Sequence, residues 1–160
     1  MRTKVALVEW REQKSFKYIE AAYEGSTKAT QTSEFKIKNI MFYKDYFGEL
    51  SALRENGYQF IIVDFGPYKH ENINTMNNLD IQLIVGHGDE WKVHELYHIF
   101  NSEDQSLFYN WKVVAVYGNK EEVREMSKRT NRKTYALSFH KDPFMWTKEL
   151  KGEIEKILDI

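Results

Sequence analysis

The sequence of 160 residues contains no cysteine and only two prolines. Without cysteine the protein has neither a disulfide framework nor thiol chemistry. An excess of charge of one sign is also missing, because 23 Lys and Arg residues are balanced by 24 Asp and Glu residues. This balance gives the chain no electrostatic attraction to nucleic acid or to an anionic membrane surface. We therefore predict no nucleic-acid partner.

Long hydrophobic runs are absent as well. No stretch of the sequence approaches the roughly 18 apolar residues that a helix needs to span a bilayer, and the first residues lack the pattern of a signal peptide. We therefore expect a soluble, cytoplasmic protein with no membrane span. The length suits one hydrophobic core, which predicts a single α/β domain over residues 1–160.

Six short apolar runs, rich in β-branched and aromatic residues, predict strands. Three of them (VALVEW, FIIVDF and WKVVAVY) are almost continuously apolar, which favours strands of a parallel sheet that are buried on both faces. The six predicted strands are Val5–Trp10, Phe35–Tyr43, Phe60–Phe65, Ile81–Gly86, Trp111–Tyr117 and Thr134–Phe139.

Segments with the spacing or the capping residues of helices lie between these strands. Asn119 is a good N-cap for a helix over Lys120–Thr130, and Asp142 followed by Pro143 predicts the start of a last helix that reaches residue 160. Three more helices are predicted within residues 16–23, 50–58 and 91–100. Since strands and helices alternate, we predict a three-layer α/β fold, with a mostly parallel sheet of about six strands and helices on both faces.

The first candidate site lies at the end of the third predicted strand, where Asp64 is followed by Gly66 in YQFIIVDFGP. Open α/β sheets bind ligands at the carboxyl ends of their strands, and in nucleotide hydrolases an Asp at such a position holds Mg²⁺ near the phosphates. The alternative is an Asp that only caps the long connection over residues 65–80. The motif by itself is compatible with both.

The order of the motifs resembles that of MinD/ParA-like P-loop ATPases. KVALVEW is similar to that family's second strand, with Glu9 as its acidic residue, and YQFIIVDFG is similar to the strand that carries the Mg²⁺-binding Asp. DIQLIVGHGDEW resembles the next strand, and WKVVAVYGN resembles the strand whose final Asn contacts the base. The resemblance implies a P-loop-NTPase-like fold in which four residues would contact nucleotide and Mg²⁺: Glu9, Asp64, Gly66 and Asn119.

The sequence departs from that family in one respect, because no G-x-x-x-x-G-K-[ST] motif occurs in it. Without this loop a triphosphate loses its main binding site. A sheet without the strand that precedes the loop can still close as a flavodoxin-like domain, with the first predicted strand beside the third. We therefore predict a non-catalytic binding or scaffolding domain that acts through a protein partner or as a homodimer and needs no cofactor. The alternative is a fragment of a functional ATPase that binds ATP and Mg²⁺, with its phosphate loop upstream of Met1.

The segment HELYH matches every position of the zinc-binding motif H-E-x-x-H. On a helix His94 and His98 share one face and can bind Zn²⁺, with Glu95 as the general base that acts on a metal-bound water. This pattern makes a zinc-dependent hydrolase the second alternative function. A catalytic zinc needs a third protein ligand, for which the sequence offers four candidates: Glu121, Glu122, Glu125 and His140. The helix also has an apolar stripe that faces a core: Val93, Leu96, Tyr97 and Phe100.

Overall fold

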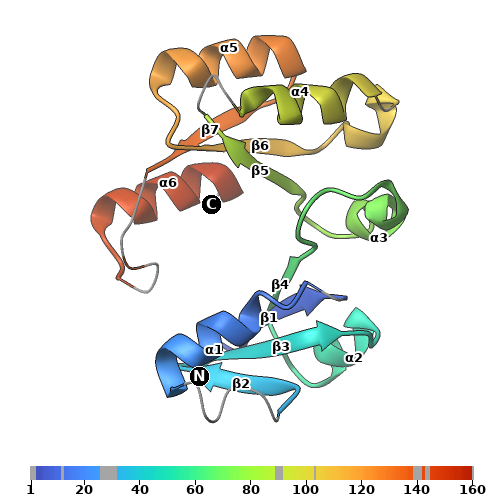
Figure 1. The fold of residues 1–160 in the computed structure, drawn as a ribbon, viewed down its shortest axis with the longest axis vertical. Helices are drawn as coiled ribbons and strands as arrows, with labels where there is room; N and C mark the ends of the chain where they lie inside the picture. The colour runs from blue at the N-terminus through green and yellow to red at the C-terminus, as the bar shows by residue number, and fades with distance from the viewer. Residues whose placement is uncertain are drawn as a thin grey trace. The chain divides into compact units, whose positions relative to one another are not determined.

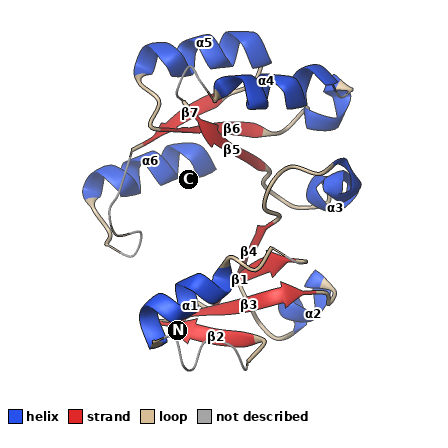
Figure 2. Ribbon diagram, in the orientation of Figure 1, coloured by secondary structure: helices blue, strands red, loops and turns tan. Residues whose placement is uncertain are grey.

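The computed structural model describes residues 3–11, 13–25, 32–88, 92–102, 104–138, 142 and 145–159. The chain divides into two compact units, Met1–Lys69 (unit 1) and His70–Ile160 (unit 2). Each unit has its own sheet and its own helices (Figures 1 and 2). The predicted α/β class is confirmed, while the single domain over residues 1–160 stays a prediction.

Unit 1 contains a mixed sheet of four strands in the order β2-β3-β1-β4. β1 pairs in parallel with β3 and β4, so the first predicted strand does lie beside the third, and β2 pairs antiparallel with β3. Helix α1 contacts β3, and helix α2 contacts β4. The bounds are β1 Val5–Trp10, α1 Phe16–Glu24, β2 Glu34–Ile37, β3 Ile40–Tyr46, α2 Leu50–Glu55 and β4 Phe60–Asp64.

The prediction of one strand over Phe35–Tyr43 is wrong. The chain turns within this run at Lys38 and Asn39 and forms the β2–β3 hairpin. Lys38 takes a left-handed backbone conformation (φ 53°), which residues other than glycine seldom adopt. Because the run contains neither glycine nor proline, Asn39 is its only sequence signal of a turn.

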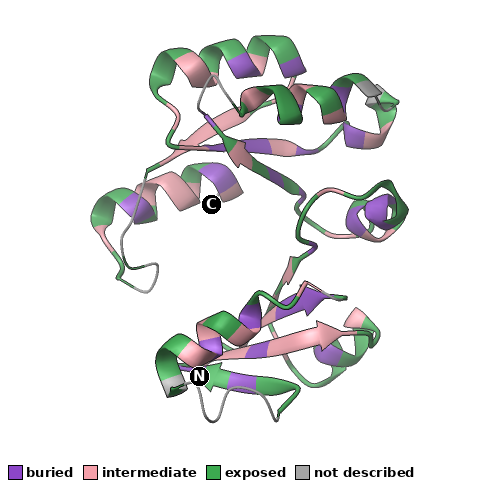
Figure 3. Ribbon diagram, viewed as in Figure 1, coloured by how far each residue is buried: buried purple, intermediate pink, exposed green. Residues whose placement is uncertain are grey.

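Aromatic packing forms the core of unit 1 on the face of the sheet that α1 covers. The buried ring of Phe42 stacks on Phe35, with 4.7 Å between ring centroids, and meets the edge of Phe16 from α1 at 5.4 Å. At the end of β1, the ring of Trp10 packs 5.4 Å from that of Phe65. Figure 3 marks buried positions along β1, whose residues are all buried or half-buried, as the apolar run predicts.

Unit 2 contains a parallel sheet of three strands in the order β5-β6-β7. Helices α4 and α5 cover one face of this sheet and α6 the other (Figure 1). Rings at the end of the sheet pack edge to face, with Phe108 lying 5.2 Å from both Phe100 and Trp111. The bounds are α3 Ile73–Asn77, β5 Leu83–His87, α4 Val93–Ser102, β6 Lys112–Val116, α5 Lys120–Thr130, β7 Thr134–Leu137 and α6 Lys148–Leu158, with 3-10 helices at His70–Asn72 and Gln105–Phe108.

The long connection over residues 65–80 contains a 3-10 helix and α3. One expectation for unit 2 needs correction. The last helix begins at Lys148 instead of Pro143, because Thr147 is its N-cap and accepts a hydrogen bond from the Leu150 N–H at 3.1 Å. Pro143 lies outside the described residues. The predicted bounds Lys120–Thr130 of α5 are confirmed. No helix in the described part of the chain has the length and hydropathy to cross a bilayer.

Candidate functional site

Two of the predicted site residues lie side by side at the carboxyl edge of the sheet in unit 1. Glu9 near the end of β1 is the register partner of Asp64 at the end of β4, because the two strands run parallel. Gly66 follows Asp64 in the same loop. The structure therefore brings Glu9, Asp64 and Gly66 to the edge where ligands of open α/β sheets bind.

The carboxylate of Glu9 is fully buried and binds the start of helix α1. Its Oε1 accepts hydrogen bonds from the Ser15 N–H, from the Ser15 hydroxyl at 2.7 Å and from the Phe16 N–H at 2.8 Å. These N–H groups have no partner within the helix, and the positive end of the helix dipole favours a negative charge there. Glu9 thus acts as a capping group for α1 that is supplied by a neighbouring strand.

Asp64 is exposed and also makes a local bond, since its Oδ1 accepts a hydrogen bond from the Gly66 N–H at 2.8 Å. Gly66 has a left-handed backbone (φ 66°), and a Cβ at this position would lie 2.0 Å from the side-chain oxygen of Gln13. Gln13 in turn donates from Nε2 to the Phe65 carbonyl at 3.0 Å. The left-handed backbone therefore favours glycine at position 66, and a Cβ there would displace the end of the Gln13 side chain.

Asp45 is a residue at this edge that sequence reasoning missed. It lies near the end of β3, and its N–H is 3.4 Å from Glu9 Oε2. Its own Oδ1 is buried and finds no hydrogen-bond partner among the described residues. Asp45 also has a left-handed backbone (φ 46°). Nothing in the surrounding sequence FYKDYF indicates this placement, because the register between β1 and β3 sets it.

Asn119 belongs to unit 2, where it caps helix α5. Its side-chain oxygen accepts hydrogen bonds from the N–H groups of Glu121 at 2.8 Å and Glu122 at 3.0 Å, while Glu122 Oε2 accepts from the Asn119 N–H at 2.6 Å. This is a reciprocal capping box. The capping role that the sequence predicts for Asn119 is confirmed, and contact with a nucleotide base stays a prediction.

The HELYH motif lies on α4 with its apolar stripe toward the core. Leu96 and Phe100 are buried, whereas His94, Glu95 and His98 are exposed. Among the residues that the structure describes, no group of three or more His, Asp or Glu side chains is placed to hold a metal ion. One of the four candidate third ligands, His140, lies outside the described residues. Zinc binding by this helix stays a prediction.

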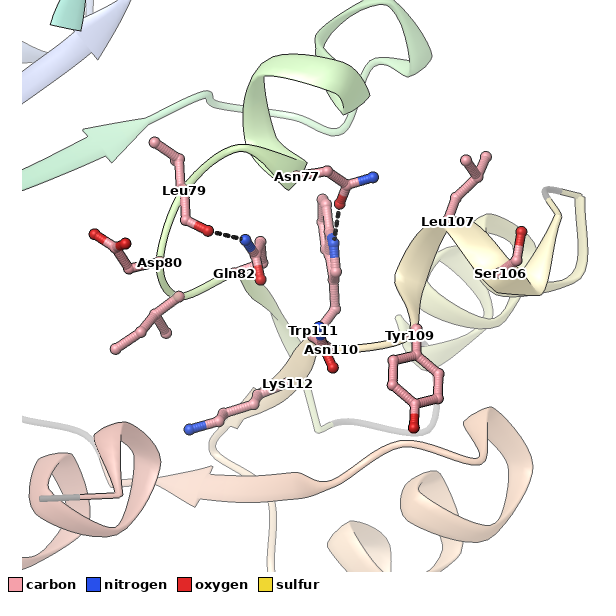
Figure 4. Close-up of a pocket in the computed structure, with 11 residues that line it drawn as sticks. Asn77, Leu79, Asp80, Gln82, Ser106, Leu107, Tyr109, Asn110, Trp111 and Lys112 are labelled. Carbon is pink, nitrogen blue, oxygen red and sulfur yellow. Dashed lines mark hydrogen bonds between the residues drawn. The ribbon is translucent and has the colours of Figure 1, made fainter. Parts of the chain in front are cut away.

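A cavity of about 340 Å³ in unit 2 lies at the opposite, amino-terminal ends of β5 and β6 (Figure 4). Trp111 donates its indole N–H to Asn77 Oδ1 at 2.6 Å, and the buried Gln82 donates from Nε2 to the carbonyls of Met76, at 3.2 Å, and Leu79. Its lining combines amides and apolar side chains with the charged side chains of Asp80 and Lys112. Sequence reasoning missed this cavity because its residues come from separate segments: Asn77, Leu79, Asp80, Ile81, Gln82, Ser106, Leu107, Tyr109, Asn110, Trp111 and Lys112.

Within its own unit, and among the residues that the structure describes, each sheet ends in an apolar edge strand with exposed side chains. In unit 1 this strand is β4, where Phe60 is 62% and Ile62 is 54% exposed. In unit 2 it is β5, where Leu83 is 39% and Val85 is 62% exposed. The prediction that the run FIIVDF is buried on both faces is therefore wrong for β4. An apolar run does not distinguish a central strand from an edge strand.

No family model matches the chain, and no curated protein matches it. Among solved structures, the MinD cell division protein of Aquifex aeolicus is similar, with a TM-score of 0.55 and 15% identity over 86% of this chain and 70% of that chain. The MinC:MinD cell division protein complex of the same organism has a TM-score of 0.56 and 13% identity, over 96% and 75% of the two chains.

A ParA family ATPase from Chlorobium tepidum TLS is also similar, with a TM-score of 0.55 and 12% identity over 99% of this chain and 78% of that chain. The fold is MinD/ParA-like. The resemblance that the order of the sequence motifs indicates is thus confirmed for the fold. At these identities the similarity concerns the fold alone, so the roles of Glu9, Asp64, Gly66 and Asn119 toward a nucleotide stay predictions.

Proposed function

We propose that this MinD/ParA-like protein is a binding or scaffolding domain that acts through contact with another polypeptide, without hydrolysing ATP. The observation that carries the proposal is the pair of apolar edge strands, β4 and β5. Natural proteins normally cover or charge the edges of their sheets, because an open edge pairs with other chains. Exposed apolar side chains on such an edge mark an interaction surface.

The residues that would contact a nucleotide support the same proposal. The described sequence contains no phosphate-binding G-x-x-x-x-G-K-[ST] motif, and the Glu9 carboxylate is committed to the start of α1. One solved structure of similar fold, moreover, is a complex of MinD with MinC. A function through protein contacts requires neither nucleotide nor metal.

Calorimetric titration with ATP and Mg²⁺ tests the absence of nucleotide binding, and phosphate release tests the absence of hydrolysis. We expect no saturable heat at millimolar ATP and no phosphate release above that of a buffer blank. Saturable binding that Asp64→Asn abolishes would contradict the proposal and favour a functional ATPase. Asp80→Asn is the matched control, because it removes an exposed carboxylate in unit 2 outside the carboxyl edge.

A second experiment tests the edge strands directly. Ile62→Lys and Val85→Lys each place a charge on an edge strand at an exposed position, so the fold tolerates them. A partner recovered with the wild-type protein is purified, and its affinity is measured against both variants. We expect at least one variant to weaken binding by about tenfold or more, because burying an unpaired charge in an interface costs more than 1.4 kcal/mol. Equal affinity for all three proteins would place the contact elsewhere.

A further inference from the structure

The cavity of about 340 Å³ in unit 2 is lined by two short helical segments and by the starts of β5 and β6 (Figure 4). Its residues come from the end of α3, from the 3-10 helix Gln105–Phe108 and from the segments that lead into the two strands, and all of them belong to unit 2. A volume of this size is typical of sites for small organic molecules. The polar groups that the fold leaves without a partner in this cavity indicate which molecule it accepts.

The side chain of Asn77, at the end of α3, is fixed by its hydrogen bond to Trp111. An indole N–H only donates, so the Asn77 atom that lies 2.6 Å from it is the amide oxygen Oδ1. The amide nitrogen Nδ2 therefore points away from Trp111, as Figure 4 shows. Nδ2 finds no acceptor in the described part of the chain. Asn77 thus leaves one hydrogen-bond donor at the cavity.

Gln82, just before β5, is fixed in the opposite sense. It is 8% exposed, and its Nε2 donates to the carbonyls of Met76 and Leu79. Since a carbonyl only accepts, the nitrogen must face these groups and the oxygen Oε1 must face away from them. Among the described residues no group donates to Oε1. An acceptor buried to this degree is unfavourable unless a water molecule or a ligand donates to it.

The remaining side chains of the lining restrict the shape and the charge of a ligand. The indole of Trp111, which is 4% exposed, supplies a flat apolar surface. The Lys112 ammonium is already bound, because it donates to the Ile157 carbonyl at 2.7 Å and to Asp159 at 2.9 Å. The exposed carboxylate of Asp80 disfavours an anion. A flat molecule without negative charge fits these groups.

We propose that this cavity binds an uncharged aromatic carboxamide. The carbonyl of the ligand accepts from Asn77 Nδ2, its amide N–H donates to Gln82 Oε1, and its ring packs against the indole of Trp111. A carboxamide carries both kinds of hydrogen-bonding group in one plane without a net charge, which neither a carboxylate nor an ammonium group does. This site is independent of the protein contacts in the proposed function, because none of its lining residues belongs to β4 or β5.

Titration of the ¹⁵N-labelled chain with benzamide tests the inference, with the indole N–H resonance of Trp111 as the readout. Trp111→Phe identifies this resonance among those of the four tryptophans by its loss. We expect a saturable shift with a dissociation constant on the order of 1 mM, because a ligand of this size gains little binding free energy. Sodium benzoate keeps the ring but has no N–H and carries a negative charge, so it should bind about tenfold more weakly or not at all.

Asn77→Asp tests the orientation of the ligand. The aspartate keeps an oxygen for the Trp111 indole N–H but replaces the donor Nδ2 with a second acceptor. Benzamide should then bind about tenfold more weakly, whereas benzamidine, whose cationic group only donates, should bind more tightly than it does to the wild-type chain. Asn101→Asp makes the same change at an exposed position of α4 outside the lining and should leave both affinities unchanged.

Circular dichroism checks that both variants are folded, and the pair of benzamide and benzoate tests the wild-type chain without any substitution. A Trp111 resonance that benzamide does not shift saturably would overturn the inference. Equal affinity of the wild-type chain for benzamide and benzoate would do the same, as would an Asn77→Asp variant that binds benzamide as tightly as the wild-type chain. The proposed function is tested separately, through ATP and Mg²⁺.

Discussion

The two units use charge in opposite ways. In unit 1 two carboxylates lie inside: Glu9 and Glu20 are at most 1% exposed, and Glu20 forms an ion pair with Lys44 at 2.5 Å. In unit 2 the central residues of β6 are apolar, and the main ion-pair network lies at the surface, where Asp159 binds Lys112 and Lys133 at 2.9 Å each. Unit 1 therefore depends on buried charges that cannot be replaced singly, whereas the charges of unit 2 are individually dispensable.

The largest expected effect is in unit 1, at the Glu20–Lys44 pair. Lys44→Met keeps the length of the side chain but leaves the Glu20 carboxylate buried with, among the residues that the structure describes, a single hydrogen bond from the Thr32 hydroxyl at 3.3 Å. We expect a loss of about 3 kcal/mol in the free energy of unfolding. Urea unfolding measures the loss, and hydrogen exchange of β1 and β3 amides localises it.

The matched change in unit 2 is Lys133→Met, which breaks an ion pair between side chains that are both more than half exposed. Its expected cost is below about 1 kcal/mol. Adding Glu20→Gln to Lys44→Met should recover part of the stability of unit 1, because the unpaired charge is gone. Equal losses of unfolding free energy in Lys44→Met and Lys133→Met would contradict the distinction between the buried charges of unit 1 and the surface charges of unit 2.

A smaller difference in the free energy of unfolding is expected between variants of the two helix caps, Glu9 at α1 and Asn119 at α5. Glu9→Ala leaves the buried N–H groups at the start of α1 without an acceptor, at a cost of about 2 kcal/mol or more. Asn119→Ala exposes the corresponding groups of α5 to water and should cost about 1 kcal/mol. Urea midpoints of the two variants, and of Asn119→Asp as a control that keeps a capping oxygen, measure this difference. A larger loss for Asn119→Ala than for Glu9→Ala would contradict it.

The surface network of unit 2 should respond to pH. Hydrogen bonds from Lys112 and Lys133 lower the pKa of Asp159 to about 2, so its contribution to stability is full above the ordinary Asp pKa and is lost as the pH falls toward 2. Hydrogen bonds that the Lys133 ammonium makes to Tyr135 and Asp159 raise the pKa of Lys133 to about 12, and that contribution to stability is lost only above the ordinary Lys pKa.

Asp159→Asn should therefore flatten the loss of stability between about pH 4 and pH 2. Asparagine also tolerates the left-handed backbone at this position (φ 58°), so the change isolates the charge. Urea midpoints of both proteins across this range measure the effect, and they should converge at the acid end. Parallel curves would show that other carboxylates control the acid response.

The smallest effect is expected at the exposed histidines of α4. His94→Ala should change the free energy of unfolding by less than about 0.5 kcal/mol and leave the metal content unchanged. Mass spectrometry of metals in the purified protein provides the readout, with His70→Ala as a control at an exposed histidine of the same unit. One equivalent of zinc that is lost in His94→Ala would favour the hydrolase alternative instead.

Much of the fold could be predicted from the sequence because its signals are local. The bounds of β1 and α5 follow from an apolar run and from a capping residue that acts within one turn. The β2–β3 hairpin was missed because its turn at Lys38 has only Asn39 as a signal. The start of α6 was misplaced because both Asp142 with Pro143 and Thr147 are good start signals. The hydrogen bond that the Thr147 hydroxyl accepts from the Leu150 N–H decides between them.

The candidate site likewise has some features with a local sequence signal and others without one. The sequence indicates that Asp64 ends a strand and that Gly66 follows it, which is enough to place both at a carboxyl edge. It does not indicate that the Glu9 carboxylate is enclosed by the start of α1, because the partners Ser15 and Phe16 are ordinary residues in sequence. The cavity beside Trp111 has no sequence signal, since it depends on how α3 and β5 approach β6.

The sequence by itself determined an α/β protein with a MinD/ParA-like order of motifs, no cysteine chemistry and no phosphate-binding loop within its 160 residues. These properties depend on composition, on local periodicity and on short-range capping. Only the tertiary structure decided that β4 and β5 are edge strands with exposed apolar side chains and that Glu9 is buried. Strand order and burial arise from contacts between residues far apart in the chain. The sequence of an apolar strand shows the same pattern whether one strand or two strands pair with it.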